Sequence, residues 1–176
     1  MLNRIEFAVL NAIQTIRFDL LDRLMVAVTT LGNGGVVWIA VGIIMLFFKK
    51  TRRMGVAVLL GLLFGLLCGN LALKNIVARV RPCAASTAPT LLIPYPSEYS
   101  FPSGHTLSSF IAASCIFAYN KKFGTWAYVL ASLIAFSRLY LYVHFPTDIM
   151  GGIVLAFPLA LFAVWISKKP KWAWLS

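Results

Sequence analysis

The chain contains only two histidines, His105 and His144, and each stands beside residues that could support a nucleophile or an acid. In the stretch SRLYLYVHFPTD (137–148), His144 precedes Pro146, a residue suited to the first turn of a helix, and Asp148 then falls in that turn. From there the carboxylate of Asp148 can reach one ring nitrogen of His144, fix its tautomer and leave the other nitrogen as a nucleophile. The alternative is a buried His–Asp hydrogen bond that only ties two helices together.

Three basic residues have the chemistry to bind a phosphate group. Arg138 offers a planar fork that matches two phosphate oxygens, which a lysine cannot do. Lys74 and Arg81 are seven residues apart, or two helical turns, so both can project from one side of a helix end. Taken alone, these two residues could instead reach toward lipid headgroups while their stems stay in the bilayer.

The stretch PSGH (102–105) is typical of a helix start that could face an anion. Ser103 can cap a helix, and Gly104 lets the backbone approach a ligand closely. The N–H groups of the first helical turn then form an anion site next to His105. An ordinary capped helix start explains the same pattern when it is taken in isolation.

The elements that must position these residues are apolar helices. The chain has 176 residues, of which 60% are hydrophobic and 12% charged, and its mean hydropathy is +0.85. A soluble domain of this size carries about 25% charged residues. Because the apolar residues lie in long blocks, we expect an all-α polytopic membrane protein made of a single domain, residues 1–176.

Six membrane spans are predicted, packed as a six-helix transmembrane bundle. The segments are Leu20–Leu31, Val36–Phe48, Met54–Leu73, Thr106–Tyr119, Trp126–Phe136 continuing toward Tyr142, and Ile149–Ile166. Before them, RIEFAVLNAIQTIRF (4–18) has apolar residues at helical spacing, with Glu6, Asn11 and Gln14 elsewhere. This pattern predicts an amphipathic helix on the membrane surface, although the first span could begin inside it. The same polar residues argue against a cleavable signal peptide.

The positive charges predict the orientation of the bundle. Nine of the sixteen Lys and Arg residues lie in KKTRR (49–53), NKK (120–122) and the tail SKKPKWAWLS (167–176). The positive-inside rule places all three segments in the cytoplasm, and six spans then place both termini there. The net charge of +11 therefore reflects topology and attraction to anionic lipid rather than binding to nucleic acid.

The same alternation of spans brings the candidate site residues to the outer face of the cell membrane. Lys74 and Arg81 follow the third span, His105 opens the fourth, and His144 follows the fifth. Ionisable groups at such positions are costly and usually functional. A transporter would distribute charges through the depth of the bilayer, and a purely structural membrane protein would leave the three stretches unexplained.

Together the three stretches resemble the tripartite signature of the type-2 phosphatidic acid phosphatase family of membrane lipid phosphatases. The matching residues are Lys74 with Arg81-Pro82 after six intervening residues, Pro102-Ser103-Gly104-His105, and Ser137-Arg138 with His144 and Asp148. The resemblance implies a helical bundle in which His144 is the nucleophile, His105 protonates the leaving group and Asp148 orients His144. It also implies that the phosphate is held by Lys74, Arg81, Ser103, Gly104 and Arg138.

The residues support this chemistry independently of the resemblance. Cations and backbone N–H groups stabilise the equatorial oxygens of a phosphoryl group as its ester bond breaks, and a phosphohistidine divides hydrolysis into two easier steps. A two-metal phosphatase needs more carboxylates than Glu98 and Asp148, the only acidic residues near the site. We therefore expect metal-independent hydrolysis without a cofactor, with a lipid phosphate in the bilayer as substrate and no obligatory protein partner.

The sequence does not distinguish between lipid substrates. The outer connection contains TLLIPYPSEYS (90–100), which could line a route for a lipid tail or could be a plain surface loop. Small bacterial proteins similar to this chain often act on undecaprenyl diphosphate, and phosphatidylglycerol phosphate and phosphatidic acid are other substrates of the family. Cys68 and Cys115 fall within spans and leave Cys83 without an obvious partner, so no disulfide framework is implied.

Overall fold

The computed structural model describes residues 2–85 and 88–169, and within these ranges the chain is helical, without β-strands. The helices are α1 (Leu2–Gln14), α2 (Asp19–Leu31), α3 (Val36–Leu46), α4 (Arg52–Phe64), α5 (Lys74–Val77), α6 (Gly104–Tyr119), α7 (Lys121–Tyr140) and α8 (Pro146–Ser167). A π-helix, η2 (Gly65–Leu73), joins α4 to α5, and 3-10 turns form at Asn33–Gly35 and Pro82–Ala84. The expectation of an all-α fold is confirmed.

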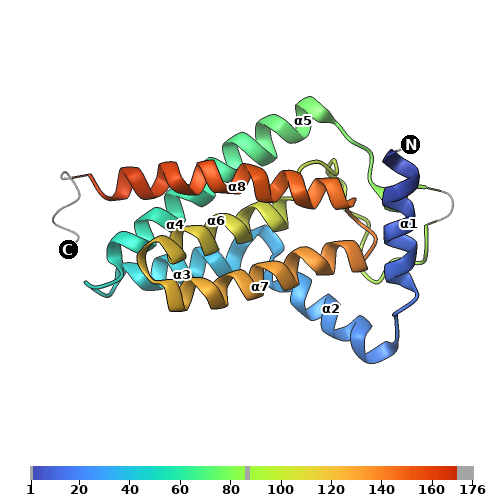
Figure 1. The fold of residues 1–176 in the computed structure, drawn as a ribbon, viewed down its shortest axis with the longest axis horizontal. Helices are drawn as coiled ribbons and strands as arrows, with labels where there is room; N and C mark the ends of the chain where they lie inside the picture. The colour runs from blue at the N-terminus through green and yellow to red at the C-terminus, as the bar shows by residue number, and fades with distance from the viewer. Residues whose placement is uncertain (1, 86–87, 170–176) are drawn as a thin grey trace.

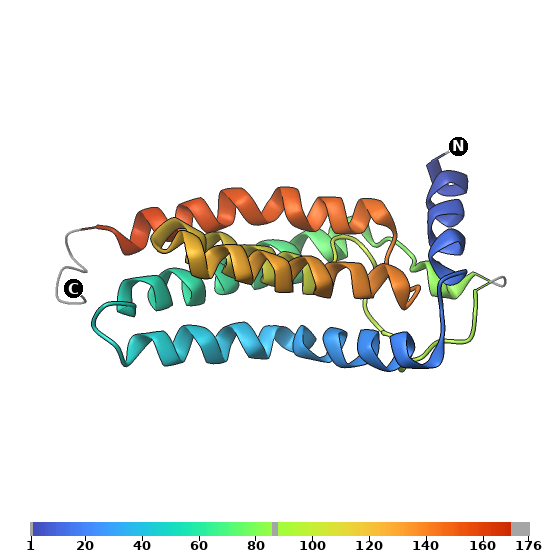
Figure 2. The ribbon, with the colours of Figure 1, turned by 60° about the horizontal axis from the view of Figure 1, so that its bottom comes forward.

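Helices α2 to α8 run along a common long axis, and α1 lies across one end of the bundle (Figure 1, Figure 2). The connections α3–α4 and α6–α7 and the end of α8 meet at the opposite end from α1. The described parts of the long connection, residues 78–85 and 88–103, and the α7–α8 turn lie at the α1 end. We call the end where α3–α4 and α6–α7 connect the basic end, and the end that carries α1 the site end. The tail beyond residue 169, which was predicted to be cytoplasmic, lies outside the described residues.

Helices α2 and α3 form one bent pair instead of two separate spans. They meet at an angle of 42° across the turn Asn33–Gly35, and Figure 2 shows them running in the same direction. Gly34 and Gly35 have φ angles of 59° and 68°, which glycine adopts without a steric penalty. These residues produce a kink but no reversal of the chain, so the prediction of two antiparallel spans here is wrong.

The described part of the bundle therefore has five lengthwise segments, namely the bent pair α2–α3, the continuous α4–η2–α5, and α6, α7 and α8. This odd number places α1 and the end of α8 at opposite ends of the bundle, whereas six spans would place them at the same end. By length and apolarity alone, Arg52–Ala84 and Pro146–Ser167 could cross a membrane, and the bent pair makes a third candidate.

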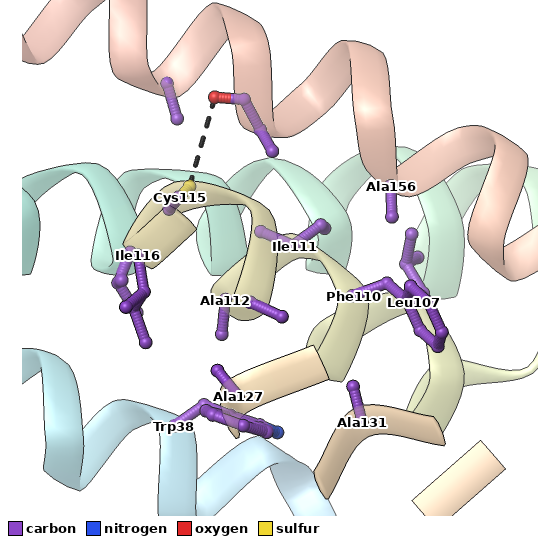
Figure 3. Packing of buried hydrophobic residues seen from close by; sticks show 14 of the residues in the cluster. Trp38, Leu107, Phe110, Ile111, Ala112, Cys115, Ile116, Ala127, Ala131 and Ala156 are labelled. Atoms are coloured by element: carbon purple, nitrogen blue, oxygen red, sulfur yellow. Dashed lines mark hydrogen bonds between the residues drawn. The ribbon is translucent and has the colours of Figure 1, made fainter. Parts of the chain in front are cut away.

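Small residues allow α6 to pack closely against its neighbours in the hydrophobic core. Figure 3 shows Ile111, Ala112 and Cys115 of α6 among residues of the surrounding helices. The Sγ of Cys115 donates to the carbonyl of Ala57 on α4 at 3.4 Å and lies 3.9 Å from the carbonyl of Ala160 on α8. Close backbone approach through small residues is the main source of helix association inside a bilayer. The core thus fixes α6, whose first turn carries His105.

Candidate active site

A cavity of about 970 Å³ opens at the site end, and most of the predicted site residues line it. Lining side chains or backbone come from Lys74, Arg81, Gly104, His105, Arg138 and His144. The other two predicted residues, Ser103 and Asp148, are fully buried and do not line the cavity. The structure thus brings together three stretches that are far apart in the sequence.

His144 and Asp148 make the contact that their spacing predicted. The Nδ1 atom of His144 lies 3.5 Å from Oδ2 of Asp148 and 3.4 Å from the Ser100 hydroxyl. The same Asp148 oxygen accepts from Ser100 Oγ at 2.5 Å and from the backbone N–H of Phe145 at 2.8 Å. Asp148 is held on several sides, so its carboxylate has a fixed orientation toward the imidazole.

Arg81 determines which nitrogen of His144 is available for chemistry. Its Nη1 lies 3.0 Å from Nε2 of His144, and a guanidinium can only donate, so Nε2 accepts and Nδ1 carries the hydrogen. Burial lowers the pKa of His144 to about 3, and the positive charge of Arg81 acts in the same direction. The ring is therefore neutral near pH 7, with its unprotonated nitrogen at the cavity.

Lys74 and Arg81 reach the cavity by a different route from the predicted one. The helix does not extend to Arg81, because α5 ends at Val77 and Ala78 adopts a left-handed conformation with φ of 47°. Arg81 follows in extended backbone and is fixed by the carbonyls of Glu98 and Tyr99, at 2.7 and 3.2 Å. The prediction of one shared helix face was wrong, although both residues do line the same cavity.

Lys74 is paired with a carboxylate from the long outer connection. Its Nζ lies 2.5 Å from Oε2 of Glu98, whose side chain is 67% exposed. The hydrogen bond from Lys74 holds the pKa of Glu98 below its usual range, so this carboxyl is ionised near pH 7. Residues 92–94 and 96–98 of this connection also line the cavity, which agrees with the predicted location of TLLIPYPSEYS over the site.

Arg138 is buried beside the cavity with part of its guanidinium unpartnered. The side chain is 4% exposed, and its Nη1 donates to the Thr29 hydroxyl of α2 at 2.6 Å. Its Nε has no hydrogen-bond partner among the described residues. A buried guanidinium with an unsatisfied donor is costly unless an anion completes its hydrogen bonds, which fits the predicted phosphate-binding role.

The start of α6 has the predicted cap. The Ser103 hydroxyl accepts from the backbone N–H of Thr106 at 3.4 Å and from its hydroxyl at 3.0 Å. The backbone N–H of Ser103 donates to the carbonyl of Asp148 at 3.1 Å, which links α6 to α8. A Cβ on Gly104 would lie 2.8 Å from Oδ1 of Asn70, so a larger residue here would have to push the Asn70 side chain aside.

Further residues contact the predicted ones and were given no site role from the sequence, although Glu98 was noted as lying near the site. Oδ1 of Asn33, in the kink between α2 and α3, accepts from Nε2 of His105 at 3.0 Å. Ser100 and Glu98 come from the outer connection, and Arg79 donates to Oδ1 of Asp148 at 2.7 Å. Arg79 lies between Lys74 and Arg81 in the sequence, and this position among predicted site residues could have indicated that it contacts the site. The contact between Asn33 and His105 joins residues 72 positions apart, and no pattern in the sequence indicates it.

The arrangement combines an uncharged nucleophilic nitrogen, a second histidine and a group of cations around one cavity. Lys74, Arg81 and Arg138 supply positive charge, and the first turn of α6 adds backbone N–H groups. Within the described residues, no three His, Cys, Asp or Glu side chains gather as a metal site. This geometry suits an in-line displacement at a phosphorus atom.

Comparison with known proteins shows which family this chain resembles. The sequence model of the PAP2 superfamily matches residues 53–172. An undecaprenyl-diphosphatase from Sulfolobus acidocaldarius is 32% identical over 152 residues, covering 84% of this chain and 71% of the relative. Phosphatidylglycerophosphatase B from Bacillus subtilis is 31% identical, covering 93% and 84%. The crystal structure of a transmembrane PAP2-type phosphatidylglycerolphosphate phosphatase from Bacillus subtilis, 30% identical, aligns with a TM-score of 0.75 over 96% of this chain and 87% of that one.

Proposed function

The chain belongs to the PAP2 superfamily, and on that premise we propose that it hydrolyses the phosphate of a membrane lipid through a phosphohistidine at His144. The observation that carries this proposal is the unprotonated Nε2 of His144 beside Arg81, at a cavity that Lys74 and Arg138 also line. Within this proposal the whole chain, residues 1–176, acts as one domain.

The first step is an attack of Nε2 of His144 on the terminal phosphorus. A P–N bond forms while the P–O bond to the leaving group breaks; His105 enters this step as the imidazolium and gives its Nδ1 proton to the leaving oxygen. Lys74, Arg81, Arg138 and the N–H groups near Gly104 hold the equatorial oxygens, which carry the developing charge. The charged Asp148 stabilises the ring as it becomes positive.

The second step restores the enzyme. Water attacks the same phosphorus and passes a proton to His105, while the P–N bond breaks and its electron pair returns to Nε2 of His144. Inorganic phosphate then leaves the cavity. Asn33 supports the role of His105 because its oxygen accepts from Nε2 and leaves Nδ1 for the proton transfer. Neither step needs a metal ion, a cofactor or a protein partner.

We propose undecaprenyl diphosphate as the substrate, with phosphatidylglycerol phosphate as the alternative. The relative from Sulfolobus acidocaldarius is an undecaprenyl-diphosphatase, whereas the one from Bacillus subtilis that covers more of this chain is a phosphatidylglycerophosphatase. The cavity wall below the cations is apolar, with residues such as Ile39, Leu59 and Leu66 that suit a lipid tail.

Phosphate release from purified protein in detergent tests this proposal. Undecaprenyl diphosphate, phosphatidylglycerol phosphate and phosphatidic acid are compared at equal surface concentration, and kcat/KM decides the order. We expect turnover of at least one lipid and the highest kcat/KM for the diphosphate. A higher kcat/KM for phosphatidylglycerol phosphate would favour the alternative, and failure to release phosphate from all three would contradict the phosphatase itself.

We further propose that the site end faces the outside of the cell membrane. The segments KKTRR and NKK lie at the basic end, which the positive-inside rule assigns to the cytoplasm. With the bent pair counted once, five crossings then put the amino terminus outside and the carboxyl terminus inside. Helix α1 lies in the outer interface, since Ile5 and Val9 on it and Ile16 just after it are exposed and suit contact with lipid.

Labelling of single cysteines in intact cells tests this orientation. In a variant whose three native cysteines are replaced by alanine, a membrane-impermeant maleimide should label Arg4→Cys without opening the membrane. Lys121→Cys should react only after the membrane is opened; both residues are exposed in the structure. The reverse pattern would invert the orientation. Labelling of both positions only after opening would restore six crossings with a cytoplasmic amino terminus.

A further inference from the structure

Arg79 links the carboxylate of Asp148 to the amino-terminal helix. Its Nη1 donates to Oδ1 of Asp148 at 2.7 Å and to the Thr147 hydroxyl at 2.6 Å. Its Nη2 donates to Oε2 of Glu6 in α1 at 2.6 Å. The guanidinium carbon also lies 4.1 Å from the centre of the Phe145 ring. One guanidinium thus joins α1 to the first turn of α8.

Glu6 is buried on the side of α1 that faces the bundle. It is 2% exposed, and its second oxygen accepts from the backbone N–H of Thr147 at 3.3 Å and from the Thr147 hydroxyl. A buried carboxylate needs a partner of opposite charge, and Arg79 supplies it. On α1, Glu6 and Leu10 therefore face the protein, while Ile5 and Val9 are exposed.

The same helix supports the turn that carries His144. Leu10 is fully buried and packs with Tyr142 and Phe145, while Oδ1 of Asn11 accepts from the Tyr142 hydroxyl at 2.9 Å. Tyr142 has a φ of 60°, a left-handed conformation that costs energy for any residue with a Cβ. Contacts from α1 hold this turn in place two residues before His144.

We propose that α1 is part of the active site and that Glu6 and Arg79 are positioning residues for Asp148 and His144. This inference rests on the proposed roles of those two residues. Arg79 fixes Oδ1 of Asp148, so that Oδ2 points toward Nδ1 of His144. Glu6 holds the other arm of Arg79 and offsets its positive charge.

The charges explain why both residues are needed. Asp148, Arg79 and Glu6 alternate in sign and sum to one negative charge, as Asp148 would supply alone. Without Glu6, Arg79 cancels the charge that stabilises His144 when the ring becomes positive. Without Arg79, the buried carboxylates of Asp148 and Glu6 lose the cation that contacts both of them. The other charged groups that act on His144 are Arg81, which contacts Nε2, and Arg138, which lines the same cavity.

The test compares Glu6→Gln, Arg79→Gln and the double variant in detergent, with kcat, KM and the rate of phosphoenzyme formation measured for each. We expect each single change to lower kcat and phosphoenzyme formation by about tenfold to a hundredfold with KM nearly unchanged, since positioning is lost while the phosphate ligands stay. The double variant restores one negative charge and should lose less than the product of the two single losses.

Asp19→Asn and Arg23→Gln are the matched controls, because they remove the same charges from exposed positions on α2. Both should keep the wild-type kcat. A kcat within about twofold of wild type for Glu6→Gln and Arg79→Gln, while His144→Ala is inactive, would overturn the inference and leave the proposed function intact. Activity in His144→Ala would instead overturn the proposed function.

Folding is followed in parallel through the Tm in detergent. If Glu6→Gln or Arg79→Gln lowers the Tm by several degrees, Arg79→Lys takes over the test, because it keeps the charge and loses the fork that bridges Glu6 and Asp148. A loss of kcat in Arg79→Lys at wild-type Tm supports the positioning role. A wild-type kcat in Arg79→Lys would show that activity needs only the positive charge at position 79 or the intact fold, and this would contradict the positioning role.

Discussion

The two ends of the bundle carry similar numbers of basic residues but use them differently. At the basic end, Lys49, Lys50, Lys121 and Lys122 are exposed, and no ion pair forms there among the described residues. At the site end lie all five acidic residues of the chain, and Lys74 and Arg79 pair with three of them. Exposed cations set orientation by attraction to anionic lipid, whereas buried cations hold a charged group in place.

This difference means that the number of basic residues alone does not identify the site. Arg53 at the basic end and Arg138 at the site end both have an Nε without a partner in the described chain. Only Arg138 lines the cavity with His105 and His144. The distinction between the two ends lies in convergence on one cavity, and variants at each end can test it.

The largest effect is expected at His144. His144→Ala should lower phosphate release by about 10⁴-fold or more and abolish the acid-labile phosphoenzyme, because no other group supplies the nucleophile. Lys121→Ala at the basic end is the control and should keep the wild-type rate. Phosphate release and trapping of labelled phosphoenzyme measure the two outcomes. If His144→Ala retained the phosphoenzyme and His105→Ala lost it, the two histidines would have the opposite roles.

A smaller loss is expected when Arg138 becomes lysine. Arg138→Lys keeps the positive charge but loses the planar fork, so kcat/KM should fall by about a hundredfold. The same change at the other end, Arg53→Lys, should alter kcat/KM by less than about twofold, which separates phosphate binding from topology. Steady-state kinetics at saturating and limiting lipid measure both. Equal losses in the two variants would remove the distinction between the ends.

A loss of about tenfold is expected for Asn33→Ala, a fraction of what a general acid contributes. Asn33 orients His105, so the loss should be greatest for substrates with a poor leaving group and small for an activated aryl phosphate. Thr30→Ala is the control, because Thr30 lies on the neighbouring helix α2 and is also a polar residue that lines the cavity. Comparing kcat/KM across leaving groups measures the effect. A loss that is the same for every leaving group would assign Asn33 a structural role only.

No effect is expected from removal of divalent metals. Excess EDTA should leave kcat unchanged, because the cations around the phosphate are side chains, and vanadate should inhibit by adopting the five-coordinate geometry of the transition state. Phosphate release with and without chelator, followed by addition of magnesium, measures this. Loss of activity in EDTA that magnesium restores would contradict the proposed chemistry.

The sequence predicted the site better than it predicted the architecture around it. His144 and Asp148 are four residues apart, and Ser103 is a preferred capping residue, so local spacing was enough to place these groups. Local spacing was misleading at Ala78, where a non-glycine residue takes a left-handed conformation and ends the helix before Arg81. The two residues still meet because Arg81 is tied to the outer connection, a contact that no periodicity encodes.

The predicted reversal of the chain between α2 and α3 was wrong for a related reason. Asn33-Gly34-Gly35 between two apolar segments is typical of a loop, and loops usually reverse the chain. In this chain the two glycines allow a bend of 42°, so the segments continue as one pair. The contacts of Asn33 with His105 and of Glu6 with Arg79 join distant parts of the sequence and depend on that geometry. They could not be derived before the helices were placed.

The pairing of Lys74 with Glu98 has a consequence for how a phosphate enters the cavity. Lys74 is already paired with the Glu98 carboxylate, so under the proposed function a phosphate that replaces this carboxylate exchanges one anion for another. The lysine is never left as a bare charge in a poorly hydrated site, which would be costly. The freed carboxylate is on an exposed side chain and returns to water. Glu98 is therefore the counterion that Lys74 holds before a phosphate takes its place.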